Sequence, residues 1–319
     1  MKSSPTTAII GAGSIGVAWA VVFVRAGYDV RVHDLDAEFR RAAPAAIHNR
    51  LQALSDAGLY ADDVATAMSQ VTVADSVGEA VHGATYVQES VVENVHVKRQ
   101  LFAKLDAVTG ADVVLASSSS MIPSSHFAAE LPDRARCLVV HPANPPYLLP
   151  LAELVPAPFT AESVVRRAEE LLRAAGMVPV VVKGEPEGFA FNRLQGALLR
   201  EAYCLVRDGV LSPRDVDRVV SLGLGRRWSV VGPFGTADLN TRGGIERHAA
   251  LMGPAYARMG AERGQDDPWP AELVAKVAFD VHTRLPIEDW SRHVAQRDRA
   301  LMTLERARRA DPHAFDTFT

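Results

Sequence analysis

A glycine-rich segment near the start of the chain carries the clearest chemical signal in the sequence. It reads Gly11-Ala12-Gly13-Ser14-Ile15-Gly16, and the apolar run Ala8-Ile9-Ile10 stands directly before it. A helical pattern follows, and the next alternating run, residues 30–33, ends on Asp34, which lies 23 residues after Gly11. An acid about 20 residues beyond the first glycine of such a turn is typical of a residue that binds a nucleotide ribose.

Each glycine of this segment meets a different structural requirement. Gly11 permits a tight turn, Gly13 lets the backbone approach a pyrophosphate, and Gly16 lets a helix pack closely on a strand. The first helical residues, Ser14 and Ile15, would then present N–H groups and a partial positive charge to the phosphates. The segment therefore predicts a site for a nicotinamide or flavin dinucleotide.

Two polar clusters directly follow strand-like runs further along. Ser117-Ser118-Ser119-Ser120 follows the apolar run 113–115, and His141 follows the run 137–140 and precedes a proline-stiffened loop. Taken singly, the serines also fit a flexible turn and the histidine a core position. Ligands of open α/β sheets, however, bind at the carboxyl ends of the strands, where both clusters stand. Glu153 lies inside another apolar run, and a buried carboxylate needs a partner such as an imidazole.

These side chains suit the oxidation of an alcohol. As a hydride leaves the carbon, a base must take the hydroxyl proton, and a histidine such as His141 suits this near neutral pH. A carboxylate behind it, here Glu153, fixes the tautomer and stabilises the imidazolium. Hydrogen-bond donors to the reacting oxygen polarise it. The combination indicates dehydrogenase chemistry.

The elements that must position these groups alternate along the first part of the chain. Further strand candidates are residues 71–73, 85–88 and 178–182, with helical stretches between them. One long helical region, residues 37–68, is expected to break at Pro44 and at Ala57-Gly58. Strands that alternate with helices predict an α/β fold, a Rossmann-type, doubly wound and mostly parallel sheet with helices on both faces.

The pattern changes near residue 187. A turn-rich junction, residues 183–188, leads into a long helical stretch over residues 189–207, and no convincing strand follows. Ser212-Pro213 reads as the start of another helix, with serine as the N-cap and proline at the first position. We therefore expect a dinucleotide-binding domain over residues 1–187 and an all-helical domain over residues 188–319.

Composition excludes several classes of partner. With 48% hydrophobic and 23% charged residues, the 319-residue chain reads as a soluble globular protein. Its net charge of −4 offers no electrostatic case for nucleic acid or an anionic membrane. The two cysteines have no metal-ligand spacing, so buried free thiols in a reducing cytoplasm and no metal are expected. The uncharged run 8–24 also fits a secretory leader, but its glycine spacing favours the nucleotide site.

Taken together, the motifs resemble those of the 3-hydroxyacyl-CoA dehydrogenase superfamily. The resemblance covers residues 8–290 and rests on the glycine segment, Val92-Glu93-Asn94 through Lys98, the four serines, the spacing of His141 and Glu153, and Gly188-Phe189-Ala190-Phe191-Asn192-Arg193-Leu194. Residues 141–147 and 223–228 are more similar to the branch that contains L-gulonate 3-dehydrogenase and lambda-crystallin. The resemblance implies that His141 is the catalytic base, that Glu153 is its paired acid, and that Ser120 and Asn192 hydrogen-bond the reacting oxygen.

The resemblance also implies a cofactor and an assembly. The cofactor is NAD, with Asp34 at the adenosine ribose and Glu93 and Lys98 lining the nicotinamide side near Ser117. An acid at position 34 would repel the 2′-phosphate of NADP. From the residues alone, Glu93 and Lys98 read as an ordinary helix start. The helical domain of this family usually forms a dimer interface, so a homodimer is implied, and Asn192 on its first helix would place the site between the domains.

The sequence leaves more than one substrate class open. The leading interpretation is a small 3-hydroxy acid, L-gulonate-like, whose carboxylate binds Arg227, a residue that equally fits a solvent-facing position. A hydroxyacyl-CoA would need several basic residues after Asp34, and carnitine would need an aromatic cage, to which Tyr147 and Trp228 could contribute. A non-catalytic, crystallin-like protein is the alternative outside the enzymes. Retention of Ser120, His141, Glu153 and Asn192 together argues against it.

Overall fold

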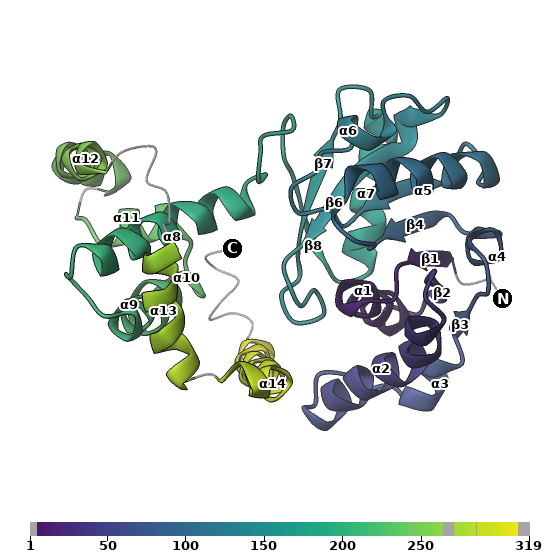
Figure 1. The fold of residues 1–319 in the computed structure, drawn as a ribbon, viewed down its shortest axis with the longest axis horizontal. Coiled ribbons are helices and arrows are strands. Elements are labelled where there is room, and N and C mark those ends of the chain that lie inside the picture. The colour runs from purple at the N-terminus through teal and green to yellow at the C-terminus, as the bar shows by residue number, and fades with distance from the viewer. Residues whose placement is uncertain (1–4, 243, 264–270, 285, 312–319) are drawn as a thin grey trace. The chain divides into compact units, whose positions relative to one another are not determined.

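The structure, a computed structural model, describes residues 5–242, 244–263, 271–284 and 286–311 (Figure 1). Its contacts divide the chain into two compact units, Met1–Arg193 and Leu194–Thr319. The chain passes from the first unit to the second within helix α8 (Phe191–Arg207). This division lies six residues beyond the domain boundary expected at residue 187.

An eight-stranded sheet forms the centre of the first unit. Its strands are β1 (Thr6–Ile10), β2 (Asp29–His33), β3 (Val71–Val73), β4 (Tyr86–Glu89), β5 (Val114–Ser117), β6 (Cys137–Pro142), β7 (Leu151–Pro156) and β8 (Val178–Val181). They lie in the order β3-β2-β1-β4-β5-β6-β7-β8, and all neighbouring pairs are parallel except β6 and β7. The order reverses on either side of β1, which is the doubly wound arrangement expected from the sequence.

Helices cover both faces of this sheet, as Figure 1 shows. They are α1 (Ser14–Arg25), α2 (Ala37–Asp56), α3 (Val64–Met68), α4 (Val77–Val81), α5 (Val95–Val108), α6 (Ser125–Ala128), the 3₁₀ turn Arg134–Arg136 and α7 (Glu162–Ala174). Side-chain oxygens of Asp36, Asp63, Ser76 and Asn94 accept backbone N–H bonds at the starts of α2, α3, α4 and α5. These N-caps satisfy donors that a helix start leaves unpaired.

Helix α1 is buried on all sides, which explains its nearly continuous apolar sequence. Every residue from Gly16 to Val24 is buried. In the adjacent strand, Ile9 faces α1, whereas Ala8 and Ile10 belong to the core cluster that also contains Phe102 and Leu105 of α5. A strand covered on both faces reads as a continuous apolar run rather than as an alternating one.

Two expectations about elements were wrong. Helix α2 continues through Pro44, because proline removes only one backbone bond while Ile47, Leu51 and Leu54 remain buried on the following turns. The break at Ala57-Gly58 is confirmed, with Gly58 at φ +71°. Strand β7 was not predicted at all. It pairs antiparallel with β6, so the chain turns back on itself between the two strands.

The second unit consists of helices joined by turns, with no strand among its described residues. After α8 come α9 (Pro213–Val219), the π-helical turn η2 (Val220–Leu224), α10 (Gly225–Trp228), α11 (Pro233–Leu239), α12 (Gly244–Glu262), α13 (Ala271–Arg284), the 3₁₀ turn η3 (Ile287–Asp289) and α14 (Trp290–Ala310). Ser212 caps α9 by accepting the Asp215 N–H, as predicted. Among the described residues of the whole chain, no helix is both long and apolar enough to cross a membrane.

The two cysteines are both buried free thiols, as expected. Burial raises the pKa of Cys137 to about 12, so this sulfur stays protonated at neutral pH and is chemically inert.

Candidate active site

The three glycines of the β1–α1 turn have distinct surroundings. Gly11 has φ +105°, and a methyl group built on it would lie 2.5 Å from the carbonyl oxygen of Ser90. A methyl group on Gly16 would lie 1.8 Å from the Gly11 carbonyl oxygen. A methyl group on Gly13 would meet no described atom within 4 Å. Gly11 and Gly16 are therefore needed by the fold itself, whereas Gly13 faces open space at the start of α1.

The start of α1 fits the phosphates of a dinucleotide. Its N-cap, Gly13, makes no side-chain capping bond, and no acid lies in the first turn. Within the described residues, the N–H groups of Ser14 and Ile15 have no hydrogen-bond acceptor. Free N–H groups and the positive end of the helix dipole are the features that bind a phosphate.

Asp34 connects the end of β2 to the glycine turn. Its Oδ2 accepts the Ala12 N–H at 2.7 Å, and its Oδ1 accepts the Asp36 N–H at 2.9 Å. Arg31 donates to the backbone carbonyls of Glu79 and His82, at the end of α4. Arg40, by contrast, donates to the Asp34 carbonyl at 2.7 Å, so one arginine lies beside the acid that is expected to bind the ribose.

Strand β7 brings Glu153 directly opposite His141. The two residues are register partners across the antiparallel pair, and Glu153 Oε2 lies 2.9 Å from His141 Nδ1. Both side chains are nearly buried, with exposed fractions of 8% for the histidine and 4% for the acid. A carboxylate accepts only from a protonated nitrogen, so Nδ1 carries the hydrogen and Nε2 keeps the lone pair that a base needs.

The second oxygen of Glu153 is held by the start of helix α8. Glu153 Oε1 accepts the N–H groups of Ala190 at 2.8 Å and Phe191 at 2.9 Å. Burial raises the pKa of Glu153, but the hydrogen bonds from His141 and from these two N–H groups outweigh burial and lower the pKa below its ordinary value. Glu153 is therefore ionised, as a partner of an imidazole should be.

Two phenylalanines flank the imidazole. The ring centroids of Phe189 and Phe191 lie 5.8 Å and 6.1 Å from that of His141. Phe189 is fully buried and has φ +52°, a left-handed conformation that a bulky residue rarely adopts. This conformation directly precedes the N–H groups that bind Glu153. Such local strain persists where the surrounding structure enforces it, and it often marks a functional site.

The serine run divides its side chains among different partners. Ser117 Oγ donates to Glu89 Oε2 at 2.6 Å, and Lys98 Nζ lies 2.8 Å and 2.9 Å from the two oxygens of Glu89. Lys98 is 1% exposed and Glu89 is fully buried, so this is a buried ion pair. Lys98 also lies 3.8 Å from Glu93. Sequence reasoning missed Glu89, although an acid at the end of an apolar strand was the available signal.

Glu93 holds the turn that follows β5. Its Oε1 accepts from the Ser119 hydroxyl at 2.5 Å and from the N–H groups of Ser120, Met121 and Ile122 at 3.0–3.2 Å. Asn192 Nδ2 donates to the Ser120 carbonyl at 2.9 Å. The first unit therefore brings Ser120 and Asn192 together, and it holds the His141–Glu153 pair at the end of the neighbouring strand β6.

Other predicted residues have different surroundings. Arg227 lies on α10 in the second unit and is exposed, as is Trp228. Tyr147 is 5% exposed, and the guanidinium carbon of Arg50 lies 5.8 Å from its ring centroid. Because the protein's own cation lies over this ring, Tyr147 does not offer an open face to a quaternary ammonium.

Comparisons with known proteins identify the family of the chain. Residues 6–185 match the NAD-binding domain of 3-hydroxyacyl-CoA dehydrogenase, and residues 188–284 match the C-terminal domain of the same family. The chain is 35% identical to the human lambda-crystallin homolog over 310 residues, which covers 93% of this chain and 94% of that protein. It is 40% identical to the L-carnitine dehydrogenase of Streptomyces coelicolor over 253 residues, or 78% and 77% of the two chains.

A solved structure has a similar fold. The crystal structure of 5-formyl-3-hydroxy-2-methylpyridine 4-carboxylic acid 5-dehydrogenase, an NAD+-dependent dismutase, matches with a TM-score of 0.81 at 28% identity and covers 95% of this chain and 98% of that chain. The glycine turn, the free N–H groups at the start of α1 and the placement of Asp34 all fit NAD, which is named for the matching family domain and for this dismutase. The chain belongs to the 3-hydroxyacyl-CoA dehydrogenase family and is an NAD-dependent oxidoreductase.

Proposed function

We propose that the protein oxidises the 3-hydroxyl of a small, L-gulonate-like 3-hydroxy acid and transfers the hydride to NAD. The observation that carries this proposal is the nearly buried pair of His141 and Glu153, whose carboxylate is held at both oxygens. A protein without catalytic activity would not need such a pair. Its retention therefore supports catalysis over a crystallin-like structural role.

In this mechanism His141 Nε2 takes the proton of the substrate hydroxyl. Glu153 keeps Nδ1 protonated and stabilises the imidazolium that forms, because its negative charge lies 2.9 Å from the ring. The Ser120 hydroxyl and the Asn192 amide would donate to the reacting oxygen. Glu93 would support both by fixing the turn that carries Ser120. When bound, NAD supplies the hydride acceptor.

The cofactor would occupy the carboxyl ends of the central strands. Gly11, Gly13 and Gly16 would admit the pyrophosphate, with N–H groups of Ser14 and Ile15 as donors. Asp34 would bind the adenosine ribose. On the nicotinamide side, Glu93 would lie nearest the cofactor, and Lys98 and Ser117 would act from the buried pair with Glu89 by shaping the strand end.

The substrate carboxylate would bind Arg227. Its exposed guanidinium can form two parallel hydrogen bonds to a carboxylate. Replacement of Arg227 by methionine would then raise KM for a free hydroxy acid while the affinity for NAD stays the same. An unchanged KM would remove Arg227 from the site.

A panel assay tests the reaction itself. The absorbance of NADH would be used to follow its formation with L-gulonate, L-3-hydroxybutyrate and L-carnitine, and its consumption with acetoacetyl-CoA. The highest kcat/KM for a free hydroxy acid supports the proposal. A strong preference for acetoacetyl-CoA or for carnitine would show that the substrate is a thioester or carnitine instead. If the protein binds NADH but turns over none of these substrates, the non-catalytic alternative is favoured.

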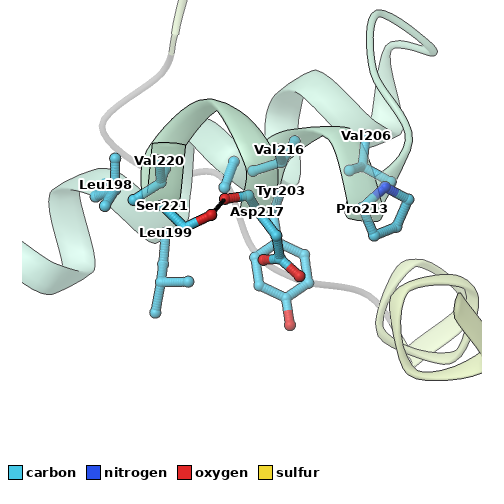
Figure 2. Close-up of a pocket in the computed structure, with 10 residues that line it drawn as sticks. Leu198, Leu199, Tyr203, Val206, Pro213, Val216, Asp217, Val220 and Ser221 are labelled. Atoms are coloured by element: carbon cyan, nitrogen blue, oxygen red, sulfur yellow. Dashed lines mark hydrogen bonds between the residues drawn. The ribbon is translucent and has the colours of Figure 1, made fainter. Parts of the chain in front are cut away.

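We also propose a homodimer that forms through the helical unit. An apolar pocket of about 440 Å³ opens between α8, α9 and η2, and Figure 2 shows Leu199, Tyr203, Val216 and Val220 among the side chains that line it. Among the described residues of this unit, exposed apolar side chains far outnumber buried ones. Apolar surface of this extent supports a partner, and the proposed partner is a second copy. Light scattering that gives the mass of one chain would contradict this.

Two buried free thiols support a reducing compartment, and we propose the cytoplasm. Fractionation of cells that express the tagged protein would test it.

A further inference from the structure

A buried polar network lies behind the glycine turn and is not used by the mechanism above. Ser118, the second serine of the run, is its centre. Ser118 Oγ lies 3.1 Å from Trp19 Nε1 of α1, 2.8 Å from Gln88 Nε2 of β4 and 2.8 Å from Ser90 Oγ. Trp19 and Gln88 are fully buried, while Ser90 is partly exposed. The network therefore leads from the interior to a hydroxyl at the surface of the strand ends.

The orientation of the Gln88 amide follows from its neighbours. Its nitrogen lies 3.4 Å from the Val140 carbonyl, which can only accept, and its oxygen lies 2.5 Å from the Tyr86 hydroxyl. With the amide turned the other way, two oxygens would face each other in a buried position. Gln88 is therefore a donor toward Ser118.

The hydrogen of Ser118 then has one possible direction. A hydroxyl group has two lone pairs and one hydrogen. The donors from Trp19 and Gln88 occupy both lone pairs, so the third contact must be a hydrogen bond that Ser118 donates to Ser90 Oγ. Within the described residues, the hydrogen of the Ser90 hydroxyl is left without an acceptor.

Ser90 lies directly against the glycine turn. Its N–H donates to the Ile10 carbonyl at 2.7 Å, at the end of β1. Its own carbonyl oxygen is the atom that a methyl group on Gly11 would meet at 2.5 Å. The free hydrogen is thus carried by a residue that follows β4, the strand next to β1, at the carboxyl edge where dinucleotides bind in such sheets.

We propose that Ser90 is a further cofactor-binding residue, whose hydroxyl donates a hydrogen bond to a phosphate or ribose oxygen of NAD. Because Ser90 accepts the hydrogen bond from Ser118, its own hydroxyl hydrogen is available to donate. This suits a cofactor whose phosphate and ribose oxygens are mainly acceptors. The inference rests on the NAD site and not on the substrate proposed above. Its test therefore measures binding, and a wrong substrate class would leave the result unchanged.

The test is the affinity for NADH, measured by titration calorimetry without substrate. Ser90→Ala is expected to raise the Kd about 3- to 10-fold, the usual effect of one lost hydrogen bond to a ligand. Ser90→Thr keeps the hydroxyl and is expected to restore the affinity. Ser76→Ala removes the cap of α4, so it serves as a matched control that lowers the melting temperature without changing the Kd.

Two results would overturn the proposal. One is a Kd for Ser90→Ala within twofold of the wild-type value. The other is an equal loss of affinity in Ser90→Ala and Ser90→Thr, because the hydroxyl would then not be the group that matters. Ser90→Cys, which keeps the size of the side chain but donates weakly, gives the same comparison should the alanine variant fail to fold.

Discussion

Glu153 binds His141 and the start of helix α8 at the same time, one carboxylate oxygen to each. Oε2 lies 2.9 Å from the imidazole, and Oε1 accepts two backbone N–H groups at 2.8 Å and 2.9 Å. The orientation of the proposed base is thereby tied to the backbone at Ala190 and Phe191. Phe189, which immediately precedes them, has a left-handed backbone conformation.

Removal of the imidazole should abolish most of the turnover. We expect His141→Ala to lower kcat by about 10²- to 10⁴-fold, the usual contribution of a general base. Because His141 lies on β6, away from the glycine turn, the Kd for NADH should stay the same. Steady-state kinetics and calorimetry on one preparation check both values. Near-wild-type turnover in a folded variant would mean that another residue is the base.

The ionised state of Glu153 should stabilise the fold in a pH-dependent way. Its pKa is lowered in the folded protein, so the contribution is fully present above the pKa of the unfolded chain, about 4.3. It is lost as the pH falls through the lower, folded pKa. The difference in unfolding free energy between the wild type and Glu153→Gln should therefore be larger at about pH 7 than at about pH 3.

Urea unfolding at the two pH values measures this difference. Glu162→Gln is the matched control, because Glu162 is 94% exposed and its removal should matter little at either pH. A difference for Glu153→Gln that is constant with pH would contradict the assignment of an ionised carboxylate.

Asp34 should set the preference for NAD over NADP. Its carboxylate would accept from the ribose 2′-hydroxyl and repel a 2′-phosphate. Asp34→Ala should lower the ratio of kcat/KM with NAD to kcat/KM with NADP. The guanidinium of Arg40, which lies close by, should help the variant to accept NADP. Asp36→Ala, which alters the cap of α2, is the control for local disruption. Comparable efficiency of the wild type with both cofactors would exclude this role.

Gly13 and Gly16 should respond differently to the same substitution. Gly13→Ala meets no described atom within 4 Å and keeps an ordinary φ of −69°, so stability should hold while NADH binding weakens. Gly16→Ala places its methyl group 1.8 Å from the Gly11 carbonyl oxygen, so the fold itself should lose about 1–3 kcal/mol or more.

Melting temperatures and NADH affinities of the two glycine variants separate the effects. If Gly13→Ala bound NADH as tightly as the wild type, the pyrophosphate would not pass over this turn.

The buried pair of Lys98 and Glu89 should be costly to break from one side. Lys98→Met leaves the Glu89 carboxylate buried without its cation, which should cost about 3–5 kcal/mol of unfolding free energy. The double variant Lys98→Met with Glu89→Leu should recover much of this loss, because no lone charge remains. Denaturant unfolding measures both. Equal losses in the single and double variants would show that packing and not charge dominates at this position.

The glycine turn, the acid at the end of β2 and the alternating pattern of strands and helices could all be read from residue types and short spacings. Each depends on local chemistry, such as backbone conformation at glycine or the burial of both faces of a parallel strand. The same holds for the cap at Ser212, where one side-chain oxygen serves the next turn of the chain.

Tertiary structure decided which groups face one another. The pairing of His141 with Glu153 depends on strand β7, whose short apolar run has no periodicity that separates strand from loop. Lys98 reaches Glu89, and Glu93 holds the turn after β5, because the ends of the paired strands β4 and β5 lie at one edge of the sheet. The donor direction at Ser90 likewise follows only from side chains far apart in sequence. Residue types suggested that Glu153 could support His141, but which atoms meet depends on the register of the sheet, which spacing along the chain does not give.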